Sequence, residues 1–559
     1  MRGFLDPLSL NAALTDGRSQ TELSSATSNA QAYNATYALI PGRGGFGLNL
    51  GGLVDHLPGF LKNSQGGEGL RRPFVNLAPT SVRLSSGLLK NESQLTSFGV
   101  PVERSSDSLL PVLQSITDLW RNSAGMTWQP LGMLRLSGDL ASTRDLRDYP
   151  DSTSLGRLVG DSRQQFLGID VGVERDRTLT TTFGLLPRVT SWLRPRLVSG
   201  STFVLSRSLT SRDPVREIDD TAGAFILPQT LNNSRQNEIG VGFDLGGIVA
   251  GIVGDSTSLG KLARRARPFD LSDRLGHTST YDLVAFDPGL SYMLALGGLD
   301  DFLNQEGEKA IAATETRTTS FSGGADLPFG ISAQLTYSRI RSNRFQQIVG
   351  RYLNTETLQR EWPSGSVRWT RTLRNGPFSL VGLGTAFRVR EGVTTLPGAI
   401  GAAPTVSSTK SSSVTPDLQV GFTNGVALTV AYNALDQESE NNGNLNRLNQ
   451  DDINGSLNYS FPLPFRISRQ KKVARSSLTA LWSKAVTCLD RPSVSACEVT
   501  SDTRRQELRA GLDTDVMQTL SAGLQFSYSV SEARHINRKF SQMIITASVQ
   551  LSLFARDYR

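Results

Sequence analysis

The C-terminal part of the chain alternates apolar and polar side chains almost without interruption. In residues 543–554, MIITASVQLSLF, the apolar side chains fall on one face and Thr, Ser and Gln mostly on the other. Residues 521–531, SAGLQFSYSVS, follow the same rule. A period of two residues predicts β-strands with one apolar face, so these two segments are predicted to form the last hairpin. Its candidate apolar positions are Leu524, Phe526, Tyr528, Ile545, Val549, Leu551 and Leu553.

The same alternation recurs upstream in short segments separated by turn residues. Examples are ISAQLTYS, SVRWTRTL, PDLQVGFT, VALTVAYN, GSLNYSF and SSLTALWSKAV. Alternating segments of about ten residues are typical of a transmembrane β-barrel. A soluble β-sandwich also accepts this pattern, with its apolar face in a core instead of in lipid.

The links between these segments alternate between short and long over about eleven strands, as in bacterial barrels with short periplasmic turns and longer outer loops. Asn-Gly favours a two-residue type I′ turn, because both central residues need positive φ. The expected outer links are residues 339–365, 392–413, 436–452, 488–497 and 531–542. The candidate inner turns are Asn375 with Gly376, Asn424 with Gly425, Leu327 with Pro328, and Leu463 with Pro464.

The N-terminal half is less regular. Residues 1–30 are expected to be disordered or the start of a fragment, 31–554 to form the barrel, and 555–559 to be a tail. Residues 247–274 contain a helix-like stretch with basic side chains on the inner side, which is either a small helix or a solvated connector; the side chains are Lys261, Arg264, Arg265 and Arg267. The whole pattern predicts an all-β fold, a large antiparallel transmembrane barrel of roughly twenty strands with a few short helices.

Composition narrows the class of protein. The chain has 559 residues, is 38% hydrophobic and carries a formal net charge of +7. No apolar run approaches the roughly eighteen residues of a membrane helix, so a helical membrane protein is excluded. The first residues also lack the apolar core of a secretory signal. An exported protein needs such a signal, so we expect either that the chain is part of a longer protein or that it is not exported.

The two cysteines, Cys488 and Cys497, stand close together in CLDRPSVSAC. With no other thiol in the chain, they are predicted to form a local disulfide in an oxidising compartment. The alternative is two free thiols. No CxxC motif or histidine cluster accompanies them, so no metal site is expected.

Motifs for catalysis or cofactor binding are weak. PGRGGFG from Pro41 matches GxGxxG, but it lacks the following helix and acidic residue of a dinucleotide site, and no cofactor is expected. His56, His277 and His535 are far apart in sequence, and no catalytic residue is assigned. The basic residues are spread along strands and turns, which favours a water-facing barrel wall over nucleic-acid binding.

Several stretches resemble the C-terminal part of the SprA/Sov family, the outer-membrane translocon of the type IX secretion system. They are RRARPFDLSDRLGHTSTYD with FDPGLSYMLALGG, REWPSGSVRWT, and APTSVRLSSGLLKNESQL. The resemblance implies a very large barrel that passes folded protein cargo, with plug-type or periplasmic subunits as partners. Chains of that family are several times longer, which again indicates a fragment. No binding residue is carried over.

The leading hypothesis is therefore a non-enzymatic outer-membrane β-barrel that forms all or part of a protein-conducting translocon. Its apolar positions would face the lipid bilayer, and Phe554 would occupy the terminal aromatic position of an outer-membrane assembly signal. A porin or small-solute transporter is the first alternative, and a surface-displayed β-rich adhesin is the second. An outer-membrane hydrolase would need a nucleophile arrangement that the sequence does not display.

Overall fold

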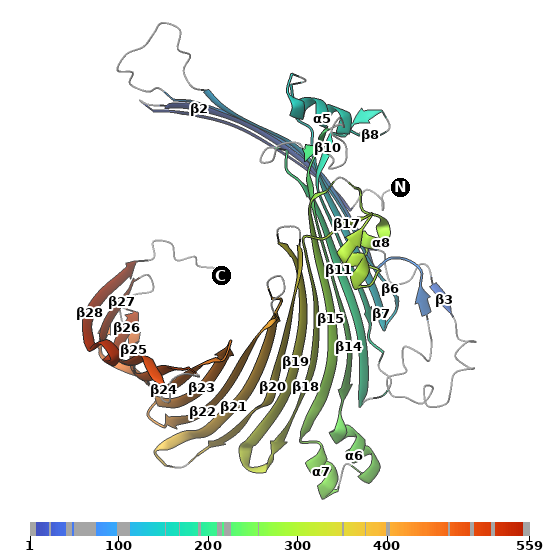
Figure 1. Cartoon of the computed structure of the whole chain (residues 1–559). Coiled ribbons are helices and arrows are strands. Elements are labelled where there is room, and N and C mark those ends of the chain that lie inside the picture. Colours follow the sequence, from blue (N-terminus) through green and yellow to red (C-terminus); the bar gives the residue numbers. More distant parts are fainter. Residues whose placement is uncertain are drawn as a thin grey trace. The chain divides into compact units, whose positions relative to one another are not determined.

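The fold is described from a computed structural model of residues 1–559 (Figure 1). It describes residues 7–551 except for 22–23, 41–46, 50–73, 98–111, 151, 167, 188–189, 191, 210–214, 217–224, 255–256, 285, 349–350, 375, 399–402, 468–469, 492–496 and 516–519. Long strands dominate these residues and form a 20-stranded sheet, in which the pairings with a described register are all antiparallel. The prediction of a large antiparallel all-β fold with few helices is confirmed.

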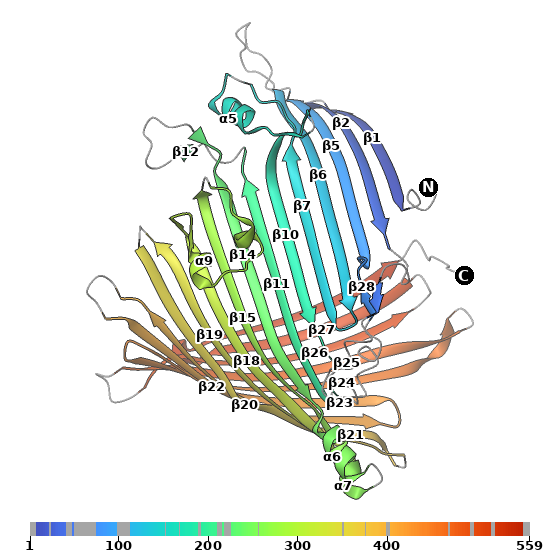
Figure 2. The same cartoon turned by 90° about the vertical axis from the view of Figure 1, so that its right-hand side faces the viewer.

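The chain divides into two compact units. The first contains Met1–Val241, Asp273–Arg317 and Asn343–Asn354. Figure 2 shows its early strands side by side, in the order β1, β2, β5, β6 and β7. Its strands are β1 (Leu8–Gln20), β2 (Ser24–Leu39), β5 (Ser81–Ser97), β6 (Val112–Leu131), β7 (Leu134–Asp145), β10 (Val173–Leu185), β11 (Leu193–Arg207) and most of β14 (Gln229–Phe243). Strands β1 and β2 differ from the expectation of a disordered start at residues 1–30.

The second unit contains Gly242–Ser272, Thr318–Ser342 and Thr355–Arg559. Besides β14, four strands have residues in both units: β15 (Ala266–Val284), β18 (Ala312–Leu327), β19 (Ile331–Ile348) and β20 (Arg351–Thr372). From β20 onward each strand pairs with the next along the chain. These strands are β21 (Phe378–Leu396), β22 (Thr405–Phe422), β23 (Val426–Asn441), β24 (Asn444–Ile467), β25 (Gln470–Asp490), β26 (Glu498–Asp515), β27 (Leu520–Ala533) and β28 (Arg538–Leu551).

Short elements occupy the connections. The helices are α5 (Ser154–Ser162), α6 (Leu245–Val253), α7 (Ser258–Ala263), α8 (Leu290–Met293) and α9 (Leu299–Leu303), with 3-10 turns η1 (Pro328–Gly330) and η2 (Arg534–Ile536). Small hairpins pair β3 (Gly47–Asn49) with β4 (Phe74–Asn76), β8 (Gln165–Phe166) with β9 (Ile169–Asp170), β12 (Val215–Arg216) with β13 (Phe225–Ile226), and β16 (Asn304–Gln305) with β17 (Glu308–Lys309). Among the residues described, no helix has the length and apolarity needed to cross a membrane.

The strands are longer than the sequence indicated. Residues 436–452, expected to be an outer loop, are instead the paired ends of β23 and β24, with only Asn442 and Gly443 between them. Residues 339–365, expected to be another outer loop, belong mainly to β19 and β20. Neither tract keeps a regular apolar alternation, so the pattern could not reveal them. Residues 436–452 are mostly polar on both faces, and residues 339–365 place apolar side chains such as Ile340 and Phe345 on both faces. Backbone hydrogen bonds of the ladder continue there regardless of side-chain polarity.

The Asn424 and Gly425 turn is confirmed in place but not in type. Only Gly425 has positive φ, at 88°, and its amide donates to the Phe422 carbonyl at 3.1 Å. Because β22 ends at Phe422 and β23 begins at Val426, the loop has three central residues and follows the type I turn plus left-handed glycine pattern. The expected type I′ turn lies instead at Asn442 and Gly443, with φ of 50° and 77°.

The Leu463 and Pro464 turn prediction is wrong. Both residues lie inside β24, which continues to Ile467, where it pairs with Gln470 of β25. The ladder shifts register between Pro462 and Arg466. Proline lacks the amide that a regular ladder requires, and a register shift is where a sheet tolerates it. In contrast, Leu327 and Pro328 do lie at a turn, where β18 ends and η1 begins.

Candidate functional site: the two faces of the sheet

One face of the second unit is apolar and uncovered. Strand register places Phe526, Ala510, Leu478, Leu457 and Leu428 in a single row across β27, β26, β25, β24 and β23. Large apolar side chains on this face stay exposed, including Leu457, Leu478 and Leu508. A soluble sandwich would bury such a row in its core, whereas here the side chains face outward.

The candidate lipid-facing residues of the last hairpin lie on this apolar face. Phe526 pairs with Ile545, and Tyr528 pairs with Met543. The exposed fractions are 51% for Leu524, 63% for Ile545 and 73% for Val549. Leu551 is the last residue of β28, whereas Leu553 and Phe554 lie outside the described residues.

Aromatic side chains mark both ends of the apolar face. Tyr432, Ile453 and Trp482 form one row toward the outer connections, and the next row is charged or small, with Asp451 paired to Lys484. Toward the inner turns, Tyr459 and Phe461 stack with ring centres 5.4 Å apart. Aromatic girdles at both interfaces flank the apolar band of transmembrane barrels.

The opposite face is polar at the same level of the strands. On β27 it carries Ser, Gly and Gln, and on β26 it carries Arg505, Glu507 and Arg509. Glu507 is 8% exposed and accepts hydrogen bonds from both arginines, one at 2.7 Å from Arg505 Nη2. Leu508, between two of these ionised residues in sequence, belongs to the apolar face. The carboxylate is paired, but the cluster keeps one uncompensated positive charge, which is costly to hold away from water.

Two further ion clusters lie on this polar face. Glu361 forms ion pairs with Arg388 Nε and with Arg390 Nη2, both at 3.2 Å. Asp417 accepts from Arg368 Nη2 at 3.1 Å. Glu361 and Arg390 are brought together by the pairing of β20 with β21, so sequence spacing alone gives no sign of this cluster.

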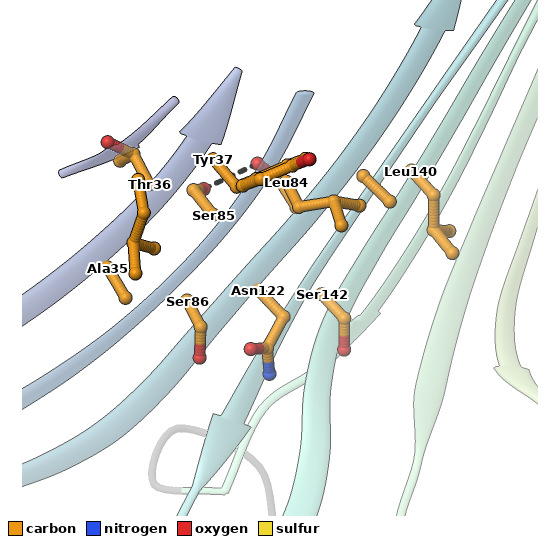
Figure 3. Close-up of a pocket in the computed structure, with 12 residues that line it drawn as sticks. Ala35, Thr36, Tyr37, Leu84, Ser85, Ser86, Asn122, Leu140 and Ser142 are labelled. Carbon is orange, nitrogen blue, oxygen red and sulfur yellow. Dashed lines mark hydrogen bonds between the residues drawn. The ribbon is translucent and has the colours of Figure 1, made fainter. Parts of the chain in front are cut away.

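The first unit has a similar apolar face on its early strands. Leu8, Tyr37, Leu84, Ala124 and Leu140 form one row across β1, β2, β5, β6 and β7. Beside it, small or polar residues form a second row that deepens the surface into a shallow groove of about 340 Å³ (Figure 3). These residues are Ala35, Ser86, Asn122 and Ser142. The groove lining holds hydroxyl and amide groups but no nucleophile with an adjacent base.

A pair of short helices packs on the outer ends of β11, β14 and β15. Tyr292 of α8 joins a buried cluster with Phe203, Leu231 and Tyr281. The ring of Phe302 of α9 lies 6.3 Å from that of Tyr292, centre to centre. Register through Leu179 places Phe203 on the same face as Leu140. These helices, which we call the outer strap (Leu290–Leu303), therefore cover the apolar face where the strands extend toward their outer connections.

The basic inner link is helical. Helices α6 and α7 lie side by side in Figure 1, in the connection from β14 to β15. Leu245 and Ile252 of α6 are exposed, at 45% and 79%. Lys261 lies in the last turn of α7, and Arg267 forms an ion pair with Asp326 at 2.6 Å. The small-helix interpretation is thus favoured over an irregular connector.

The two cysteines form a disulfide that joins the outer ends of β25 and β26. Their Cα atoms are 5.6 Å apart and their sulfur atoms are bonded. In this arrangement the bridge holds the two strands together where their connection leaves the sheet. At the candidate inner turn, Asn375 lies outside the described residues, and its neighbour Gly376 has φ of 115°.

The remaining sequence motifs do not form a catalytic or metal site among the residues that the structure describes. The GxGxxG segment and His56 lie almost wholly outside the described residues. His277 is buried in the first unit, stacks on Phe302 and contacts Glu315 at 3.0 Å, whereas His535 lies at η2 and accepts from the Asp502 amide at 3.3 Å. Within the described ranges, no group of three or more His, Cys, Asp or Glu side chains forms a potential metal site.

Comparison with known proteins gives structural matches only. No protein-family model matches the sequence, and the search of curated proteins gives no match. The β-domain of the Bordetella autotransporter Brka matches with 13% identity and a TM-score of 0.20, over 43% of this chain and 92% of that one. A bacterial polysaccharide outer membrane secretin matches with 11% identity and a TM-score of 0.20, over 75% and 98%.

The siderophore receptor PirA from Acinetobacter baumannii also matches, with 11% identity and a TM-score of 0.23, over 97% of this chain and 80% of that one. Likenesses at this level assign no family. The function is therefore inferred from the strands of this chain.

Proposed function

We propose that this chain forms the wall of an outer-membrane β-barrel channel. The observation that carries the proposal is the opposite character of the two faces at one depth: exposed Leu508 and Leu478 on one side, and ionised Glu507 and Arg509 on the other. The two faces are both in a favourable environment if the apolar face meets lipid and the charged face meets water. A soluble adhesin would leave the apolar band in contact with water, at a cost of about 25 cal/mol per Å².

The height of the apolar band supports a membrane role. On β24 the band runs from Ile453 to Phe461, with aromatic residues near both limits. A transmembrane strand needs about 9–11 residues at its usual tilt. The rest of β24 is the polar end that precedes Ile453, starting at Asn444, and the segment that follows Phe461, ending at Ile467. Within lipid every backbone group needs a partner, so the proposed barrel requires its first and last strands to be paired as well.

For cargo, we propose secreted proteins, as the resemblance to the SprA/Sov translocons implies. Two of the stretches that carry this resemblance lie in β15 and β20, and a third lies in β5. In this proposal the chain is not an enzyme: its polar face offers a hydrated path, and other secretion-system subunits act as partners. A porin that passes small solutes is the competing function, since the same two faces would serve it.

The membrane proposal is tested by single cysteines placed along β27 between Ala522 and Val530. The chain has two cysteines, and both are in the disulfide, so an introduced cysteine supplies the one thiol that can react with the label. In outer-membrane vesicles, a membrane-impermeant maleimide is expected to label Ser527→Cys and Ser529→Cys. Phe526→Cys and Tyr528→Cys are expected to resist it until detergent is added. Equal labelling of all four positions would contradict a lipid-facing band.

The cargo is tested by a photoreactive amino acid at Ser529 on the polar face, with Tyr528 as the matched position on the apolar face. If the channel conducts proteins, irradiation of cells is expected to yield protein adducts from position 529 but not from 528. If liposomes containing the protein swell in small sugars and no adduct forms, the porin alternative replaces the translocon.

A further inference from the structure

Two clusters on the polar face of the second unit share one arrangement, a carboxylate held between two arginines. Glu507 lies between Arg505 and Arg509 on β26. Glu361 of β20 lies between Arg388 and Arg390 of β21. A third example occurs within the first unit, where Glu238 contacts Arg196 Nε at 2.7 Å and Arg274 Nε at 2.8 Å. Each cluster carries one more positive than negative charge.

The two kinds of charge differ in exposure. The Glu507 side chain is 7% exposed, whereas those of Arg505 and Arg509 are 55% and 64% exposed. Glu361 follows the same rule at 18%, against 58% for Arg388. In the Glu507 and Glu361 clusters the carboxylates therefore lie close to the sheet and hold the guanidinium groups in place, while the guanidinium groups are exposed.

Hydroxyl side chains surround the cluster on β26. Register pairs Arg505 with Ser483 and Ser531, and pairs Arg509 with Thr479 and Ser527. Directly opposed residues have Cβ atoms about 4.5–5.5 Å apart, so each arginine has a hydroxyl side chain as its direct neighbour on both sides. Arginine and hydroxyl donors together suit carboxylate or phosphate oxygens, which accept several hydrogen bonds at once.

We propose that these Arg–Glu–Arg clusters make the polar face prefer anions, so that the channel favours anionic solutes or acidic segments of cargo. This inference rests on the proposed channel function. A water-filled path lined by low-dielectric walls concentrates ions opposite in sign to its exposed charges. Rings of arginine or lysine give anion selectivity to other pores by the same physics.

The test is the reversal potential of the full-length protein in planar bilayers under a tenfold KCl gradient. The unmodified protein is expected to reverse near the chloride potential. Arg505→Gln with Arg509→Gln is expected to shift it toward the potassium potential, and Glu507→Gln is expected to shift it further toward chloride. Arg504→Gln is the matched control, because Arg504 pairs with Glu532 and Lys484 on the other face and its loss should leave the potential unchanged.

A second measurement does not need the arginine variants to fold. In Ser527→Cys, the thiol lies opposite Arg509. An anionic methanethiosulfonate is expected to modify it several-fold faster than a cationic reagent of similar size. Equal rates, or channels that conduct without chloride preference, would overturn the anion inference while leaving the channel in place. The absence of any conductance from all variants would contradict the channel function itself.

Discussion

At the residue scale, neighbouring positions of one strand lie on faces of opposite polarity. Leu457 shares its row with Leu428 and Leu478, whereas Asn458 lies on the polar face. Leu457→Lys is expected to destabilise the folded protein by roughly 2–4 kcal/mol, because it places a charge near the middle of the lipid band. Asn458→Lys, the matched control, should change the stability little. Urea unfolding in lipid vesicles measures both, and equal losses would contradict the assignment of faces.

Single residues also decide where the strands turn. Asn442 and Gly443 both have positive φ, which a β-branched side chain resists. Asn442→Val is expected to destabilise the β23–β24 hairpin by roughly 1–2 kcal/mol. The paired position Asn441, at the end of β23, provides the control variant Asn441→Val. Hydrogen exchange of the hairpin amides should quicken in the first variant only, and unchanged exchange would argue against a strained turn.

At the element scale, the sequence predicts strands only where their faces differ. Alternation identifies the middle parts of β23 to β28, because one face there is apolar and the other is polar. The ends of β23 and β24 are polar on both faces, so they carry no two-residue period and the sequence predicts a loop there. The ion clusters could not be predicted either, because Glu361 meets Arg390 only through the register of β20 and β21.

The outer strap is an element whose stability depends on a few aromatic side chains. Phe302 is 1% exposed, stacks on His277, and its carbonyl accepts a hydrogen bond from the Tyr281 hydroxyl at 3.0 Å. Phe302→Ala is expected to lower the free energy of unfolding by about 3–5 kcal/mol, because it removes a buried aromatic ring. Limited proteolysis should then cleave the Leu290–Leu303 region first. Leu296→Ala is the control, because Leu296 is 69% exposed; equal protease sensitivity in both variants would contradict the packed strap.

At the scale of the whole molecule, the height of the apolar band sets which bilayer accepts the protein. From Ile453 to Phe461 the band extends roughly 26 Å along β24, at about 3.3 Å per residue. A strand tilt of about 40° reduces this to a height near 20 Å, a little below the roughly 25 Å of the outward apolar band of known barrels. Refolding yield is therefore expected to be higher in dilauroyl than in dioleoyl phosphatidylcholine vesicles, because a mismatch in thickness costs free energy for every ångström.

Two further variants test whether the preference for a thin bilayer comes from the height of the apolar band. Asp451 and Lys484 pair in the first row beyond Ile453 and Trp482 on the same face. Replacing both with Leu extends the band by one row, so the yield in the thicker bilayer should rise relative to the unmodified protein. The adjacent pair Asp452 and Ser483 lies on the polar face, and the same replacement there should lower the yield in both lipids. A yield independent of lipid thickness in every variant would mean that this face does not meet the bilayer.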